Sequence, residues 1–173
     1  MTMKTILRYD LSVQFALAIV LAAGMSACGI YRFKDVSIPP DVKTCRVQYI
    51  ENRARFVNPQ LSPQLTEKLR QKINNQTRLT LIQGDEADYD IRCEISGYDV
   101  TTAGIAQQQA ATNRLIVSVK VVFRNKLDEK KNFEATVSRN FDFSANLSLD
   151  QAQAQLTSTI IQNVADEIFN KIC

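Results

Sequence analysis

From residue 114 to residue 143 the chain reads RLIVSVKVVFRNKLDEKKNFEATVSRNFDF. In its first part, five apolar residues at every second position share one side of a strand: Leu115, Val117, Val119, Val121 and Phe123. A charged turn at 125–131 follows, and a second strand is predicted at 132–143. Together they predict an antiparallel hairpin, which we expect to project as the longest part of the domain.

Two segments around this hairpin have the apolar spacing of helices. The first is predicted to start at Ser62, a favoured N-cap residue followed by Pro63, and to end at Asn74-Asn75. The second is predicted to start at Ser148, which has capping-box spacing to Gln151, and to run almost to the chain end.

Three more strands are predicted, at residues 44–50, 78–82 and 89–100. Residues 101–113 carry consecutive glutamines among small residues, which indicates a mobile loop or an extended hairpin tip. Helices do not alternate regularly with strands, so a doubly wound parallel sheet is disfavoured. The sequence therefore predicts an α+β fold, with two helices packed on one face of a mixed, mostly antiparallel sheet of about four to five strands.

The N-terminus has the features of an export signal. Basic residues Lys4 and Arg8 precede a short apolar run, which ends in Ser26-Ala27-Cys28. This ending matches the cleavage motif of lipoprotein signal peptidase, except that Met25 replaces the usual Leu. We therefore predict a signal peptide at 1–27 cut between Ala27 and Cys28, a tether at 28–41 and a single domain at 42–173. The alternative is an ordinary secretory signal, with Cys28 an unmodified thiol.

Cys28 would then carry covalent diacylglycerol and an N-linked acyl chain such as palmitate, and no other cofactor is expected. The remaining cysteines, Cys45, Cys93 and Cys173, are odd in number, so at most one pair can form within the chain. Cys45 and Cys93 lie on the apolar sides of predicted strands, which favours core positions. Buried free thiols and one disulfide both remain open.

The composition disfavours several functional classes. The net charge is only +3 with both signs interspersed, which does not indicate nucleic-acid binding. The chain has no histidine, no Gly-x-Ser-x-Gly motif and no glycine-rich phosphate loop. The acidic residues at 85–90 have the wrong spacing for a calcium loop and are interpreted as a solvated turn. We therefore predict no catalytic site, no metal site and no enzyme activity.

Basic residues at three places are candidates for binding anionic lipid head groups, because arginine in particular suits phosphate. The alternative is ordinary surface charge. The candidates are Arg53, Arg55, Arg114, Lys126, Lys130 and Lys131.

Several short pieces, in this order and spacing, resemble the LptE family, the lipoprotein subunit of the outer-membrane lipopolysaccharide assembly complex. The pieces are Cys28-Gly29-Ile30-Tyr31-Arg32-Phe33, Ser37-Ile38-Pro39-Pro40-Asp41-Val42-Lys43-Thr44, Asn52-Arg53-Ala54-Arg55, Val57-Asn58-Pro59, Leu65-Thr66-Glu67-Lys68-Leu69, Asn113-Arg114-Leu115, Phe133-Glu134, Ser138-Arg139 and Asp166-Glu167-Ile168-Phe169-Asn170. Together they cover nearly the whole predicted mature chain, as a compact, divergent branch of the family.

The resemblance implies two helices against a mixed four-stranded sheet. It also implies a partner, the outer-membrane barrel LptD, which such proteins plug and help to assemble, and a role in lipopolysaccharide transport. The six basic residues would then contact lipopolysaccharide or the barrel, while only the lipidated cysteine transfers from the family, to Cys28. Because no Asp follows Cys28, we expect an outer-membrane anchor with the domain on the periplasmic side. A free-standing periplasmic lipoprotein, acting as a transporter auxiliary or ligand-binding module, is the alternative.

Overall fold

The computed structural model describes residues 38–106 and 109–173. The chain separates into two units, Met1–Asp35 and Val36–Cys173, and the description below concerns the second. The predicted signal peptide, the cleavage site at Ala27 and Cys28, and most of the tether lie outside the described residues.

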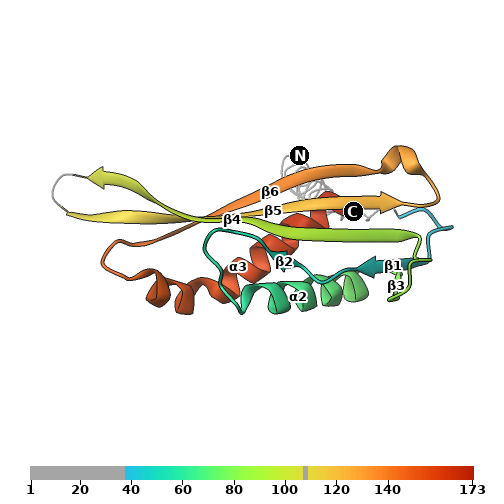
Figure 1. Cartoon of the computed structure of the whole chain (residues 1–173), viewed down its shortest axis with the longest axis horizontal. Helices are drawn as coiled ribbons and strands as arrows, with labels where there is room; N and C mark the ends of the chain where they lie inside the picture. Colours follow the sequence, from blue (N-terminus) through green and yellow to red (C-terminus); the bar gives the residue numbers. More distant parts are fainter. Residues whose placement is uncertain (1–37, 107–108) are drawn as a thin grey trace, which may run out of the picture. The chain divides into compact units, whose positions relative to one another are not determined.

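The sheet is mixed and has six strands, two of them only two residues long (Figure 1). Its order is β3-β1-β4-β5-β6, and β2 pairs with β4 outside this order. The β1–β3, β1–β4 and β2–β4 pairs are parallel, whereas the β4–β5 and β5–β6 pairs are antiparallel. The strands are β1 (Thr44–Val47), β2 (Glu51–Asn52), β3 (Thr80–Leu81), β4 (Tyr89–Ala106), β5 (Gln109–Asn125) and β6 (Phe133–Ser144). The predicted fold class is confirmed. The predicted strand 44–50 is shorter than expected, since β1 ends at Val47, and the sixth strand is β2, which lies just beyond the predicted strand and pairs with β4.

The longest hairpin is formed by β4 and β5, whereas the sequence pattern favoured the hairpin 114–143. The pairs Thr102↔Asn113, Gly104↔Thr112 and Ala106↔Gln109 continue the β4–β5 ladder through the segment predicted as a loop or hairpin tip. The hairpin-tip alternative is the correct one. The strand pattern was invisible because Thr101, Thr102 and Ala103 are exposed, so burial does not select for apolar alternation at these positions.

A β-bulge in β4 changes which residues face the core. Ile91, Cys93 and Ile95 are buried at every second position, but the next buried residue is Tyr98, after the register shift between Ile95 and Gly97. Gly97 is favoured by close packing, since a Cβ built there would lie 3.2 Å from Cβ of Ser118 on β5. The extra residue therefore keeps Tyr98 on the core side of β4.

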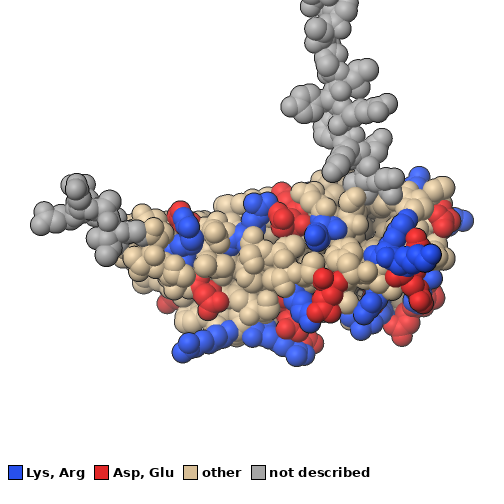
Figure 2. Space-filling model, turned by 90° about the horizontal axis from the view of Figure 1, so that it is seen from above, with Lys and Arg blue, Asp and Glu red and all other residues tan. Residues whose placement is uncertain are grey.

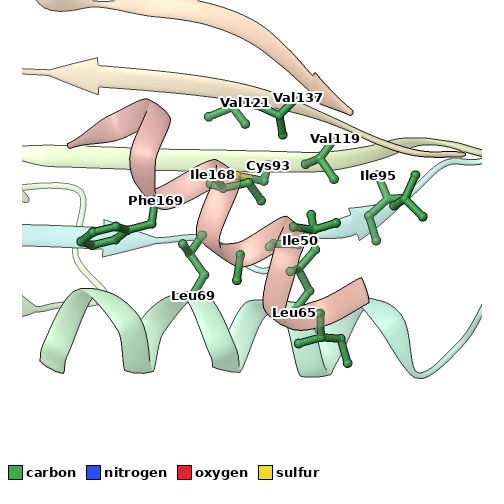
Figure 3. Packing of buried hydrophobic residues seen from close by; sticks show 14 of the residues in the cluster. Ile50, Leu65, Leu69, Cys93, Ile95, Val119, Val121, Val137, Ile168 and Phe169 are labelled. Carbon is green, nitrogen blue, oxygen red and sulfur yellow. The ribbon is translucent and has the colours of Figure 1, made fainter. Parts of the chain in front are cut away.

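Two helices, α2 (Leu61–Gln76) and α3 (Leu149–Ile172), cover one face of the sheet (Figure 1). Apolar side chains from both helices and from the inner face of β4, β5 and β6 form one core between the layers (Figure 3). Lys72 of α2 joins the helices at the rim of this core, because its Nζ lies 2.8 Å from Asp166 Oδ1 and 5.1 Å from the ring centroid of Phe169.

The capping box predicted for the last helix is confirmed: the Ser148 hydroxyl accepts from the Gln151 amide, and the Gln151 side chain accepts from the Ser148 amide. The predicted N-cap of α2 is wrong. Gln60 holds that position without a side-chain cap, and Ser62 lies buried in the first turn. The fully buried Leu61 draws the chain into the helix before Ser62 is reached, so burial overrides the capping preference of serine.

Candidate interaction surfaces

The face of the sheet that bears no helix is a lattice of charged pairs. Lys and Arg alternate with Asp and Glu over the body of the molecule (Figure 2). Three pairs link neighbouring or nearby positions on this face: Arg92 with Asp90 at 2.9 Å, Lys120 with Glu134 at 2.7 Å, and Arg114 with Asp142 at 2.6 Å. This face therefore presents both signs of charge at short spacing, without a single-sign field.

Asp90 is the buried centre of this lattice, with only 4% of its surface exposed. Its carboxylate accepts from Arg46 Nε at 2.7 Å, Gln48 Nε2 at 3.1 Å and Arg92 Nε at 2.9 Å. Burial alone would raise the pKa of Asp90, but the hydrogen bonds from Arg46, Gln48 and Arg92 outweigh it and hold the pKa below its ordinary value. The hydrogen bond to Asp90 is also the main cause that raises the pKa of Arg46. The network thus fixes β1 to β4 through charge.

A hollow of about 370 Å³ lies on the same face, where β2, β4 and β5 meet. Its cations already have carboxylate neighbours: Arg53 lies 3.0 Å from Glu51 and 3.5 Å from Glu94. An anionic ligand at Arg53 would have to compete with both glutamates. The hollow is therefore not a bare phosphate pocket.

The loop between β2 and α2 presents the second basic candidate next to exposed apolar surface. Ala54 and Asn58 are buried and anchor the loop, while Asn58 Oδ1 accepts from the Gln60 amide at 3.0 Å. Between the anchors, Arg55 is exposed, and Phe56 and Val57 are 49% and 56% exposed. Within residues 38–106 and 109–173, Arg55 has no carboxylate partner. A fixed loop thus offers one cation and two apolar side chains to a partner.

The turn between β5 and β6 is fixed by hydrogen bonds. The buried Asn125 accepts through Oδ1 from the amides of Leu127 and Asp128, and its own amide donates to Asn132 Oδ1 at 2.6 Å. A 3₁₀ turn, η1 (Glu129–Lys131), follows.

The three lysines of this turn differ in their partners. Lys126 Nζ donates to the backbone oxygen of Asp85, and Lys131 Nζ lies 3.7 Å from Asp128. Lys130 is exposed and has no carboxylate partner in the part of the chain that the structure describes.

The six basic candidates do not converge on one site. Arg53 and Arg55 lie in the loop before α2, Arg114 lies within the sheet, and the three lysines lie at the β5–β6 turn (Figure 1). The bidentate pair with Arg114 also holds the pKa of Asp142 below its ordinary value, so the guanidinium of Arg114 is committed to this carboxylate. Contacts between these residues and lipopolysaccharide or a barrel stay a prediction.

A groove of about 640 Å³ between α2 and α3 was not anticipated from the sequence. It is lined mainly by neutral polar side chains, including Gln60, Gln64, Gln71, Thr157, Ser158 and Gln162. The signal was present as glutamines at helical spacing on α2, but polar residues on an outer helix face are common and do not single out a groove.

The thiols of Cys45, Cys93 and Cys173 are free in the structure. Burial raises the pKa of Cys45 and of Cys93 to about 12, whereas Cys173, directly after α3, is exposed. The predicted core positions of Cys45 and Cys93 are confirmed. At neutral pH these two buried thiols stay protonated and make poor nucleophiles.

The acidic stretch at 85–90 serves the fold. Asp88 Oδ2 accepts from the amides of Lys43 and Thr44 and from the Thr44 hydroxyl, each at 2.9 Å, and the two amides are the main cause that lowers the pKa of Asp88. Over residues 38–106 and 109–173, no group of three potential metal ligands comes together, and no helix is long and apolar enough to cross a membrane.

Comparison with known proteins finds one matching family model and several solved structures of similar fold. The family model for LptE, described as lipopolysaccharide-assembly, matches residues 42–172. Among solved structures, a minor lipoprotein from Acinetobacter baumannii is similar at TM-score 0.51 and 15% identity, covering 75% of this chain and 91% of that one. A rare lipoprotein B from Shewanella oneidensis is similar at TM-score 0.49 and 13% identity, covering 75% and 93%. No curated relative matches the chain in sequence.

Proposed function

Because the chain belongs to the lipopolysaccharide-assembly family LptE, we propose that it is a non-catalytic lipoprotein that plugs the outer-membrane barrel LptD and supports its assembly. In this role it takes part in the transport of lipopolysaccharide and its insertion at the outer membrane. The observation that carries the proposal is the family match over residues 42–172, which spans both helices and all six strands.

The surface of the domain suits contact with the inside of a barrel. The lumen of an outer-membrane barrel is lined by polar side chains, so a plug needs a polar surface with fixed geometry. The open face of the sheet supplies paired charges of both signs, and the α2–α3 groove supplies neutral amides and hydroxyls. Charged and polar side chains on these surfaces can form ion pairs and hydrogen bonds with polar side chains of the barrel wall, so that few charges are left unpaired on binding.

The loop between β2 and α2 is the most promising contact point outside these surfaces. Aromatic and arginine side chains carry a large share of the energy in protein interfaces. Phe56 and Arg55 stand next to each other on a loop that is anchored by buried Ala54 and Asn58. We therefore expect Phe56→Ala to weaken partner binding more than Arg53→Ala, since Arg53 is already paired with glutamates.

The anchor belongs to the same proposal. Lipid on Cys28 would hold the domain at the periplasmic side of the outer membrane, from which it can enter the lumen of the barrel. Cys28→Ala should abolish labelling by a fatty-acid probe and leave an unanchored or uncleaved product. Normal labelling and membrane retention of that variant would refute lipidation at Cys28.

The test of the function is depletion of the protein in its own cells. We expect barrel maturation and cell-surface lipopolysaccharide to fall together, and the tagged protein to recover a large barrel from detergent-solubilised membranes at equal stoichiometry. If both quantities stay normal and no barrel is recovered, a free-standing lipoprotein that serves a transporter or a ligand is the better account.

A further inference from the structure

The β4–β5 hairpin extends past the rest of the sheet as a two-stranded ribbon (Figure 1). On one side, β2 ends at the pair Asn52↔Ile95, and the last neighbouring contact is the amide of Arg53 donating to the oxygen of Ile95 at 2.9 Å. On the other side, β6 ends at the pair Thr112↔Ser144. Among the residues that the structure describes, no strand pairs with the edge of β4 opposite β5 from Val100 to Ala106.

The ribbon carries no charge. Residues 100–113 read VTTAGIAQQQAATN, between Asp99 and Arg114, although 23% of the whole chain is charged. Charged residues cover the body but thin out towards the projecting end of the molecule (Figure 2). Proteins normally protect open strand edges with charged residues or proline, because bare edges pair with other chains. Here that protection is missing from the edge that extends farthest.

The same segment stands outside the hydrophobic core. Val100 pairs with Leu115, which in turn pairs with Phe141. Towards the tip of the hairpin, this row across three strands is among the last with side chains in the core. Leu115 and Phe141 are buried, whereas Val100 is 42% exposed and Thr101, Thr102 and Ala103 are all exposed. Two-stranded hairpins without a packed face are marginally stable on their own. Ordering the ribbon therefore costs conformational entropy that packing within the domain does not offset.

We propose that the open edge of β4 from Val100 to Ala106 binds an extended segment of a partner protein, which adds to the ribbon as a further strand. The inference rests on the proposed function only for the identity of that partner, the LptD barrel. Pairing with a strand satisfies the free backbone N–H and C=O groups directly and needs no charged side chain.

Other occupants fit the edge less well. An anionic head group would find no cation within residues 100–113. A lipid chain would leave the backbone groups of the edge without hydrogen-bond partners. A polypeptide in extended conformation meets both conditions.

The first experiment places a photo-crosslinking amino acid at Ala103 in the full-length lipoprotein in cells and identifies the crosslinked peptides by mass spectrometry. A crosslink to one defined segment of the barrel, or of another protein that co-purifies at equal stoichiometry, is the expected result. A crosslink only to the chain itself, to a second copy or to lipid would overturn the inference, as would the absence of any crosslink.

The second experiment introduces opposite charges on the ribbon, with the double substitution Thr101→Lys and Ala103→Asp. Recovery of the partner should fall about tenfold, while the thermal unfolding midpoint of the isolated domain stays unchanged. The matched control, Asn74→Asp with Gln76→Lys, puts the same charges on exposed positions at the end of α2, outside the proposed contact surfaces, and should change recovery less than twofold. Equal recovery for the ribbon variant and the control would refute strand addition at β4.

The outcomes separate this inference from the proposed function. If the wild-type protein recovers a barrel but Ala103 does not crosslink to it, the export function stands and the ribbon is not the contact. If Ala103 crosslinks to a stoichiometric partner that is not a barrel, the ribbon contact stands and the export function fails.

Discussion

Asp90 offers a quantitative test of how this sheet is held together. The substitution Asp90→Ala removes a carboxylate that is 4% exposed and accepts from Arg46, Gln48 and Arg92. Losing one member of a buried charge pair costs about 3–5 kcal/mol, because the remaining charge is left without a partner. The lower end applies here, since the Arg46 side chain is 15% exposed and that of Arg92 is 58% exposed, so water can solvate both once Asp90 is gone. We therefore expect a loss of about 3 kcal/mol in the free energy of unfolding.

The assay is urea unfolding followed by circular dichroism, where such a loss lowers the midpoint by about 1–2 M. The matched control is Asp142→Ala, which removes another aspartate–arginine pair from the same face. Asp142 and Arg114 are half-exposed, so water replaces the lost contact and we expect little change. Equal effects of the two substitutions, or a negligible effect of Asp90→Ala, would refute the view that burial sets the strength of these pairs.

The pH dependence of the same network has a defined sign. The pKa of Asp90 is lower in the folded protein than in the unfolded chain. As the pH falls, the unfolded chain therefore binds the proton first, and folding loses stability. The contribution of Asp90 is complete above about pH 4, the ordinary aspartate pKa, and is lost as the pH falls through the lower pKa of the folded state. Asp90→Asn should flatten the loss of stability of the wild type below about pH 4, and an unchanged acid profile would count against this assignment.

Three further predictions concern the helix caps, the bulge and the thiols. Ser148→Ala should lower the free energy of unfolding by about 1 kcal/mol through loss of the capping box, whereas Ser62→Ala should not destabilise, because the Ser62 hydroxyl is buried without a hydrogen-bond partner; equal losses in chemical denaturation would contradict both assignments. Gly97→Val should be more destabilising than Ser96→Val in thermal unfolding, since a Cβ at residue 97 lies 3.2 Å from Cβ of Ser118 while Ser96 is exposed. Cys45 and Cys93 should resist maleimide labelling at pH 7.5 in the folded protein and react after unfolding, because burial raises the pKa of both thiols to about 12; rapid labelling of the folded domain would show that these strands are open to solvent.

The parts of the fold that sequence patterns predicted are those that pack against the helices. Alternation at Leu115–Phe123 located β5 because every second residue there is buried between layers. Ser62 and Ser148 show the limit of local signals. Both have the right residue type, but only Ser148 caps a helix, since the neighbour of Ser62, Leu61, is fully buried and starts α2 earlier. Tertiary burial decided between two similar local patterns.

The candidate surfaces were harder to predict for a different reason. The partner of Arg114 is Asp142, which is 28 residues away, and the partner of Lys120 is Glu134. Such pairs depend on the register between strands, which a single sequence does not reveal until the strands are aligned. Counting basic residues therefore overstated the free positive charge. Of the six candidates, Arg55 and Lys130 are the two without a carboxylate or backbone oxygen partner for their charged group among the described residues.

The segment that gave the weakest sequence pattern is also the one with the strongest reason to bind something. Where a segment packs on its own domain, burial selects apolar alternation, and where it only faces water, charge usually protects its edges. Residues 100–106 and 109–113 follow neither rule, although they form the far ends of the two longest strands. A segment that has neither apolar alternation nor protecting charges gains no stability inside its own domain, which indicates that it is stabilised by a binding partner. A partner strand on β4 supplies that stabilisation, because it would complete the hydrogen bonding of an edge that the domain leaves open.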